Sequence, residues 1–276
     1  MLRKYADFLL VLVALSWGST FILVKKAIED LPAFSFLFVR FFLAFLLMYV
    51  FFHKKIEIDK KILKASLILG FLNFSAYALQ TVSLYYLPSN IVAFLTGLFV
   101  IFTPVSAYFF FKKEIPKKVI IAAILAFLGI YFLTQAKFAF SIYVFLVILC
   151  AFFYALHINF TDIFSKKYNI FSLVTFQFLF VAIFSLFLIP FEDLQNVKIS
   201  FTVVFAIIIT VVFATVFAFF VQTFAQQFTT PTKTAIIFAL EPVSAAFLGA
   251  FFGESLNIKQ IIGGVLVVIS MITAEI

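Results

Sequence analysis

The sequence predicts an all-α integral membrane protein of ten transmembrane helices, formed by two inverted five-helix repeats. Three observations predict this class: an apolar composition, apolar runs long enough to cross a bilayer, and short motifs that occur twice. Of the 276 residues, 66% are hydrophobic and 12% are charged, and the mean hydropathy is +1.23. A soluble domain has roughly half its residues apolar and about 25% charged. The composition therefore excludes an ordinary soluble domain.

The apolar runs follow one another along the whole chain, separated by prolines, basic clusters and short polar breaks. About 17 to 25 apolar residues cross a bilayer as a helix, whereas a barrel shows alternating segments of ~10 residues. The first run contains a pattern like a signal peptide, but it continues to Val24, so we expect a membrane helix there. We expect helices at residues 6–25, 32–52, 62–86, 89–111, 117–135, 139–161, 170–190, 200–227, 231–252 and 257–275.

The boundaries of these helices rest on particular residues. In the first half they are Pro32, Lys54-Lys55, Pro88, Lys112-Lys113 and Pro116. In the second half they are Lys166-Lys167, Pro190, Pro231 and Asn257. Proline cannot continue a helical hydrogen-bond ladder from within, and lysine clusters are costly in lipid, so both end a membrane span.

Basic residues predict the orientation of the helices. With a cytoplasmic N-terminus, the cytoplasmic loops hold 14 Lys and Arg residues and the outer loops hold 5, and Arg40 inside a helix completes the 20. Cytoplasmic loops of membrane proteins carry an excess of Lys and Arg. We therefore expect a multi-pass protein of the plasma (inner) membrane with both termini cytoplasmic. The net charge of +8 then reflects topology, and we expect no nucleic-acid partner.

Four motifs occur twice in the same order, at nearly constant spacing. Their offsets are 137, 142, 138 and 140 residues, for the pairs Phe34-Ser35 and Phe171-Ser172, Gln80-Thr81 and Gln222-Thr223, Pro104-Val105-Ser106-Ala107 and Pro242-Val243-Ser244-Ala245, and Glu114 and Glu254. We expect a repeated unit at residues 1–136 and 137–276. Because five helices is an odd number, the second unit enters the membrane from the opposite side, as in secondary transporters with a midplane site between the halves.

Several stretches of the chain carry a family resemblance. They are "ALSWGSTFILVKKAIEDLP" at 14–32, "VRFFLAF" at 39–45, "NIVAFLTGLFVIFTPVSAYFFFKKEIP" at 90–116 and "ALEPVSAAFLGAFFGESL" at 239–256. These stretches resemble the EamA family of the drug/metabolite transporter superfamily, over essentially the whole chain and in two copies. The resemblance implies a ten-helix inner-membrane carrier, with both termini inside, that moves small metabolites, often amino acids, usually outward.

Polar side chains inside the predicted helices are candidates for a substrate site, because they face the bundle interior. Asn73, Tyr77 and Gln80 share one stripe of a helix, at spacing i, i+4 and i+7. Their counterparts in the second half are Thr215, Phe219 and Gln222. The two stripes either line a central cavity or bond neighbouring helices.

Aromatic residues and a histidine occupy corresponding places in the first and sixth helices. Trp17 and Tyr154 lie 137 residues apart, and we expect them to form walls of the site rather than lipid-facing bulk. His157 lacks a partner that would make a metal site, so it is either a titrating cavity group or a packed neutral side chain. Thr96 precedes the run that ends at Pro104 and is a further candidate.

Two charged residues inside predicted helices need a partner or a function. Arg40 either binds a substrate carboxylate or fixes its helix through backbone carbonyls or Glu241. Glu241 precedes Pro242 in mid-helix, where the first repeat has Thr103. It is either a cavity carboxylate that binds a substrate amine or a coupling proton, or one side of an ion pair with Arg40. Bent helices at matching prolines indicate a binding site.

The expected function is secondary active transport of small metabolites such as amino acids, as an exporter working by alternating access. The alternative is a passive channel or facilitator for small polar solutes. An intramembrane enzyme is less favoured, since no HExxH, GxSxG or Gly-Lys phosphate loop occurs. We expect no cofactor and no metal. The expected partners are a small-molecule substrate, membrane lipid and a coupling proton at Glu241 or His157, with the chain acting as a monomer or homodimer.

Overall fold

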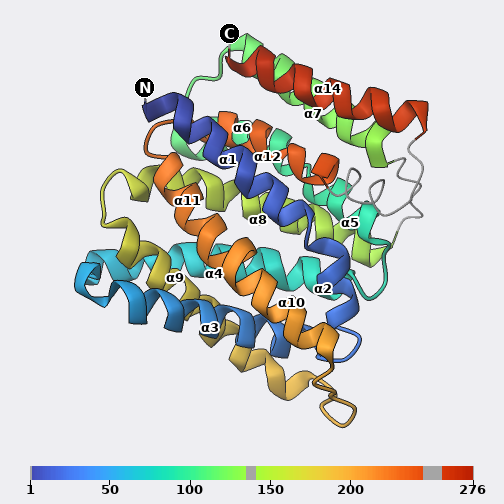
Figure 1. Ribbon diagram of the computed structural model, residues 1–276. Helices are drawn as coiled ribbons and strands as arrows, with labels where there is room; N and C mark the ends of the chain where they lie inside the picture. Colours follow the sequence, from blue (N-terminus) through green and yellow to red (C-terminus); the bar gives the residue numbers. More distant parts are fainter. Residues whose placement is uncertain (1, 135–140, 245–256, 276) are drawn as a thin grey trace.

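A computed structural model describes residues 2–134, 141–244 and 257–275 (Figure 1). In these ranges the chain forms helices joined by short turns and contains no strand. Figure 1 shows a bundle of roughly aligned helices, with α7 and α14 side by side along one edge. The prediction of an all-helical fold is confirmed for the described residues.

The helices follow the predicted runs, with four internal breaks. The first half contains α1 (Leu2–Gly18), α2 (Phe21–Ala27), α3 (Ala33–Phe52), α4 (Lys60–Ser83), α5 (Ser89–Thr96), α6 (Phe99–Phe111) and α7 (Lys117–Thr134). The second half contains α8 (Ile142–Ser165), α9 (Ile170–Leu188), α10 (Phe201–Val211), a π-helical segment (Val212–Phe217), α11 (Ala218–Ala225), α12 (Pro231–Phe238) and α14 (Ile258–Glu275). Short 3-10 turns follow α3 and α9, at His53–Lys55 and Ile189–Phe191. Residues 240–244 are also helical, and the predicted continuation to residue 252 lies outside the described residues.

Seven helical segments of the described chain are long and apolar enough to cross a membrane. They are Tyr5–Ala27, Ala33–Lys55, Lys60–Ser83, Ile91–Phe111, Ile142–Ser165, Ile170–Phe191 and Phe201–Ala225. A shorter apolar helix spans Ile258–Ser270. The expected number of ten spans therefore stays a prediction.

Local sequence explains where many helices begin. Asp59 caps α4 by accepting from Lys61 N at 2.8 Å and Ile62 N at 3.3 Å. Asn169 caps α9 in the same way, with Oδ1 2.9 Å from Phe171 N. Ser141, Ser200 and Thr230 cap α8, α10 and α12. Side-chain oxygens at these positions satisfy backbone N–H groups that have no partner within the helix.

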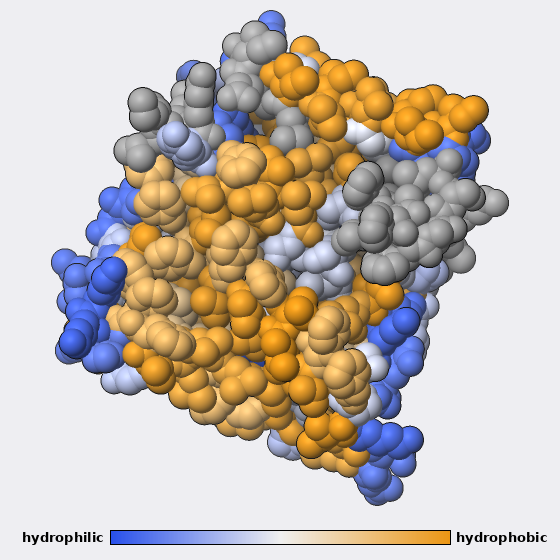
Figure 2. All heavy atoms as spheres, in the orientation of Figure 1, coloured by the Kyte–Doolittle hydropathy of each residue, from blue (hydrophilic) through white to orange (hydrophobic). Residues whose placement is uncertain are grey.

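The outer surface of the bundle is apolar across its middle. Figure 2 shows an orange hydrophobic zone flanked by blue hydrophilic regions at its left and right edges. Phe51, Phe109 and Phe187 are 72%, 71% and 70% exposed. Phenylalanine side chains this exposed would be unfavourable in water but suit a lipid environment. The exposed apolar belt therefore supports a membrane-embedded bundle.

Four of the predicted continuous helices are interrupted. The first breaks after Gly18, because a Cβ there would lie 2.2 Å from the Glu241 carbonyl oxygen, and Thr20 N and Oγ1 both bond to Trp17 O. The fourth breaks at Gly97, where a Cβ would lie 3.0 Å from Ile130 Cδ1. The eighth contains the π-helical segment, and the ninth breaks at Ala239, between α12 and residues 240–244. At Gly18 and Gly97 the absence of a side chain permits another segment to approach closely.

Candidate functional site

A narrow cavity lies at the centre of the bundle, among α1, α2, α3, α4, α5, α6, α8, α11 and α12. The centres of water-sized spheres can occupy about 50 Å³ of it. One buried water needs roughly 10 to 15 Å³ on this measure, so the cavity has room for a few waters and must widen for a metabolite. It brings together nine of the ten predicted site residues: Trp17, Arg40, Tyr77, Gln80, Thr96, Tyr154, His157, Gln222 and Glu241.

Asn73 is the exception among the predicted site residues. It is fully buried but does not line the cavity, and neither its Oδ1 nor its Nδ2 has a hydrogen-bond partner. Tyr77, Gln80 and Thr81 line the cavity from α4, and Leu84 lines it from the residue after this helix, so the cavity ends along α4 near Tyr77. The stripe was predicted with the correct face, but it extends too far along the helix axis.

Arg40 is held by a set of acceptors from other helices. Its Nε donates to Thr215 Oγ1 at 2.7 Å, and its Nη2 donates to Ala214 O at 3.0 Å and to Tyr77 OH at 3.2 Å. The guanidinium carbon lies 4.8 Å from the centroid of the Tyr77 ring, within cation-π range. Arg40 thus fixes α3 to the π-helical segment, which is the structural role among the two considered. It forms no ion pair with Glu241.

The π-helical segment supplies the acceptor that joins these helices. Ala214 O accepts from Trp17 Nε1 at 2.9 Å as well as from Arg40. A π-helical turn leaves the regular i to i−4 pattern, and such turns are frequent at functional sites. One backbone carbonyl therefore positions an aromatic wall from α1 and the arginine from α3.

Two glutamines line the cavity in different surroundings. Gln80 Nε2 donates to Thr96 Oγ1 at 3.0 Å, and its Oε1 lies 3.5 Å from Tyr154 OH. Gln222 Nε2 donates to Gln226 Oε1 at 3.0 Å. Gln222 Oε1 is buried and has no partner. Gln80 is therefore paired on both sides, whereas Gln222 keeps a free acceptor.

Glu241 lies where residues 240–244 pass the break between α1 and α2. Its backbone oxygen accepts from Ser244 Oγ at 2.8 Å and lies beside Gly18. The residue is 8% exposed and lines the cavity. Within the described part of the chain, no hydrogen bond or ion pair reaches its carboxylate. The ion pair with Arg40 considered from the sequence is therefore not formed.

His157 is buried against aromatic and amide groups. Its Nε2 lies 3.1 Å from Gln177 Oε1, and its ring lies edge-on to Phe219 with centroids 5.7 Å apart. Gln177 is the counterpart of Arg40 in the second half. Across residues 2–134, 141–244 and 257–275, no group of His, Cys, Asp and Glu side chains is arranged to hold a metal.

Two phenylalanines also form walls of the cavity: Phe219, which belongs to the second-half stripe, and Phe238, which the sequence did not single out. Phe238 meets the Trp17 ring edge-on at 4.9 Å between centroids, and Phe219 lies 5.4 Å from Trp17 and 6.2 Å from Tyr77. Among 46 phenylalanines, no local feature distinguishes these two. The repeat gives the available signal, because Phe219 is the counterpart of Tyr77.

Comparison with known proteins identifies the family. The model of the EamA-like transporter family matches residues 4–135 and again residues 141–274. This chain belongs to the EamA-like transporter family. An "Uncharacterized transporter" of Archaeoglobus fulgidus is 32% identical over 273 residues, which are 98% of this chain and 85% of that protein. A solved structure titled "Crystal structure of protein" has a TM-score of 0.83, covers 99% of this chain and 96% of its own, and at 15% identity shares the fold.

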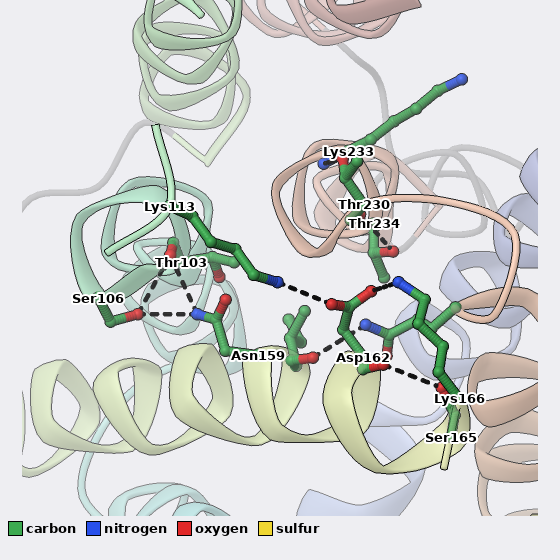
Figure 3. A network of polar contacts seen from close by, with 12 residues as sticks. Thr103, Ser106, Lys113, Asn159, Asp162, Ser165, Lys166, Thr230, Lys233 and Thr234 are labelled. Atoms are coloured by element: carbon green, nitrogen blue, oxygen red, sulfur yellow. Dashed lines mark hydrogen bonds and ion pairs between the residues drawn. The ribbon is translucent and has the colours of Figure 1, made fainter. Parts of the chain in front are cut away.

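This EamA-like transporter is a multi-pass membrane protein. At one end of the bundle, ion pairs with buried carboxylates connect its helices. We call this the basic end, where His53–Lys55, Lys113, Lys166 and Lys233 lie. Figure 3 shows Lys113 and Lys166 both pointing at Asp162 of α8. Lys113 Nζ lies 2.8 Å from Asp162 Oδ2, and Asp162 is 3% exposed. Both lysines therefore hold a carboxylate that is removed from water.

Neighbouring contacts extend this cluster at the basic end of the transporter. One turn before Asp162, Asn159 Nδ2 donates to Thr103 O at 3.0 Å and to Ser106 Oγ at 2.9 Å (Figure 3). Lys233 of α12 pairs with Asp7 of α1 at 2.8 Å. These contacts join α6 to α8 and α12 to α1 at the basic end. Glu114 lines a hollow beside the cluster, and its counterpart Glu254 lies outside the described residues.

The opposite end of the transporter is joined by a different carboxylate. Glu192, after α9, accepts from Phe34 N at 2.6 Å and from Ser35 N at 2.9 Å, so it caps the start of α3. Tyr85 OH accepts from Ala33 N at 2.9 Å, and burial raises the pKa of Tyr85 to about 12. A carboxylate at a helix N-terminus is favoured by the helix dipole. These contacts fix the loops around α3.

Proposed function

We propose that this transporter is a secondary carrier that exports small metabolites such as amino acids across the plasma membrane by alternating access. The observation that carries the proposal is the central cavity, which both family-matched segments line with corresponding residues. Gln80 corresponds to Gln222, and Trp17 corresponds to Tyr154. A site at the centre of the membrane, between two related halves, is typical of secondary transporters.

The proposed architecture is ten spans in two inverted repeats, at residues 1–136 and 137–276, with both termini cytoplasmic. The helix contacts support it, because they occur in related pairs. α4 packs on α8 as its proposed counterpart α11 packs on α1, and α6 packs on α8 as α12 packs on α1. Proposed counterparts also pack on each other, as α3 with α9, α6 with α12, and α7 with α14. A two-fold relation between the halves accounts for this pattern.

In the proposed mechanism, the two ends of the cavity close in turn, so that only one end is open at a time. In this conformation the ion pairs of Asp162 and Asp7 hold the basic end together, while α2 and the last turns of α4 line the cavity towards the other end. Rocking of one half against the other would open the basic end to the cytoplasm. Glu241 and His157 are the proposed carriers of a coupling proton, because both line the cavity.

Counterflow in proteoliposomes tests the proposed function. Vesicles containing the purified transporter and an excess of unlabelled metabolite are diluted into the labelled compound, with amino acids tried first. A carrier accumulates the label transiently, and its rate saturates with concentration. A passive channel equilibrates the label without accumulation, and that result would replace the carrier with the channel or facilitator alternative. Vesicles without protein provide the background.

A further inference from the structure

The two charged side chains of the described cavity lining, Arg40 and Glu241, differ in what remains for a ligand. Arg40 uses Nε and Nη2 on Thr215, Ala214 and Tyr77, and its guanidinium lies against the Tyr77 ring. The Glu241 carboxylate receives no hydrogen bond from the described residues. The protein thus uses the Nε and Nη2 donors of the arginine, whereas the carboxylate receives no hydrogen bond from the described residues and is left for a ligand.

The orientation of Gln222 adds a second acceptor. Gln226 Nε2 donates to Ile158 O at 2.9 Å, so Gln226 presents its Oε1 to Gln222 and takes a hydrogen bond from Gln222 Nε2 at 3.0 Å. The Gln222 amide is thereby fixed with its donor used and its Oε1 unpartnered, in a residue that is 1% exposed. A buried acceptor without a partner is costly, and a ligand donor would remove that cost.

The cavity walls near Glu241 are aromatic. Trp17 precedes Gly18, whose Cα lies against the Glu241 backbone, and Phe238 is three residues before Glu241 and contacts the Trp17 ring. Faces of aromatic rings attract cations, and their area also suits an apolar group. The free carboxylate, the free amide oxygen and the rings therefore complement the same kind of ligand.

We propose that the cavity selects substrates that carry a positively charged amine on an apolar body. Glu241 and Gln222 Oε1 accept hydrogen bonds from the ammonium group, and the rings of Trp17 and Phe238 pack on the body. This inference rests on the proposed function and narrows its substrate class. An anionic head group would face an unpaired carboxylate, and a neutral head group would leave that carboxylate without a counter-charge, so both are selected against.

Three ligands that share one body test this selection. Phenethylamine, 2-phenylethanol and 3-phenylpropionate carry the same phenylethyl body with a cationic, a neutral and an anionic head group. Their binding to the purified wild-type transporter is measured by calorimetry and by the shift in Tm, because a ligand of the folded state raises the apparent stability. We expect phenethylamine to bind about 10- to 100-fold more tightly than the other two, the range expected for a charge-assisted hydrogen bond. Equal or weaker binding of phenethylamine, or no binding of it, overturns the proposal.

Two variants locate the selection in this cavity. Glu241→Gln keeps the shape and removes the charge, and Gln222→Leu removes the acceptor; each is expected to weaken phenethylamine binding by about tenfold or more. Gln195→Leu, in the exposed loop before α10, is the matched control and should bind as the wild type does. Unchanged binding of phenethylamine to Glu241→Gln overturns the assignment and leaves a coupling proton as the role of this carboxylate. Counterflow of a non-amine metabolite would also overturn the amine selection while the carrier function stands, so the two failures are distinguishable.

Discussion

Arg40 and Gln222 show how the same site combines fixed and free polar groups. Arg40 has three acceptors from α4 and the π-helical segment, so it joins helices in this conformation. Gln222 has its donor paired and its acceptor free. Buried polar groups in a membrane bundle serve either as interhelical contacts or as parts of a pathway, and the state of each partner distinguishes the two.

Replacing Gln80 or Gln222 with leucine tests whether these residues serve transport. Each change removes polar groups from the cavity. The loss of one hydrogen bond to the substrate costs about 1 to 3 kcal/mol, which lowers the transport rate by roughly 5- to 150-fold. Counterflow per folded molecule in the membrane is the measurement. Gln195→Leu, in an exposed loop, is the control and should retain full activity. Normal counterflow with both Gln80 and Gln222 replaced would show that they are interhelical contacts alone.

At the residue scale, the sequence predicted which polar residues meet but not where the cavity ends. Polar side chains in apolar helices are unfavourable in contact with lipid, so Tyr77, Gln80 and Gln222 were recognisable as residues of the bundle interior. Asn73 shares their face, yet seven residues of helix place it about 10 Å along the axis from Gln80. The depth of a cavity depends on neighbouring helices, and no helical periodicity contains that information.

The interruptions of the helices are the main feature at the scale of elements. The break after Gly18 lies where small residues surround Trp17 and permit the close approach of another segment. The π-helical segment at Val212–Phe217 has no such local signal, because its sequence is an ordinary apolar run. It is stabilised by contacts of Ala214 O with Trp17 and Arg40, which come from distant parts of the chain. Tertiary contacts determine the π-helical conformation of this segment, so the local sequence could not predict it.

Deleting Phe213 tests the role of the π-helical segment. Phe213 is 52% exposed, and its removal would restore a regular helix at the cost of one residue. A π-helical turn accommodates one extra residue within a helix, so the deletion keeps the orientation of α11 and returns Ala214 O to a regular i to i−4 hydrogen bond. Trp17 and Arg40 would lose this acceptor, and we expect counterflow to fall to the background level with helical content retained by circular dichroism. Deletion of Gln195 in the loop is the control. Full transport by the Phe213 deletion variant would show that transport does not need the π-helical segment.

Asp162 is expected to hold the basic end closed. In a Cys150→Ser background, Ala107→Cys reports access there, because Ala107 lines the hollow and is 2% exposed. Adding Asp162→Asn should raise the rate of maleimide labelling about fivefold, since two part-exposed ion pairs contribute roughly 1 kcal/mol together. Lys167→Gln, at an exposed lysine beside the cluster, should leave the rate unchanged. An equal rate with and without Asp162 would mean that packing alone closes this end.

At the scale of the whole molecule, composition and the repeat carried most of the prediction. The apolar belt and the membership of the EamA-like transporter family confirm a multi-pass membrane protein. The family model matches residues 4–135 and 141–274, and the repeat units at 1–136 and 137–276 stay a prediction. The sequence contains no comparable signal for the identity of the substrate. Substrate identity depends on a few side chains, and their hydrogen-bond partners are known from the structure alone.

Cysteine labelling tests the inverted arrangement of the two halves. Lys60 begins α4 beyond the end of α3, whereas Asn196 lies in the loop after Glu192, which caps the start of α3. The 20 residues of α3 separate these points by about 30 Å. In a Cys150→Ser background, Lys60→Cys should label from the cytoplasmic side and Asn196→Cys from the outer side. Labelling of both from one side would refute the proposed topology.

The most direct test of the account is whether substrate passes through the central cavity. Val24 lines it from α2 and is 7% exposed, whereas Lys26 lies on the exposed side of the same helix. In a Cys150→Ser background, complete modification of Val24→Cys with a methanethiosulfonate reagent should reduce counterflow to the background level, and modification of Lys26→Cys should leave it intact. Full counterflow by the completely modified Val24→Cys variant would contradict the account, since the narrow cavity cannot hold both the added group and a substrate.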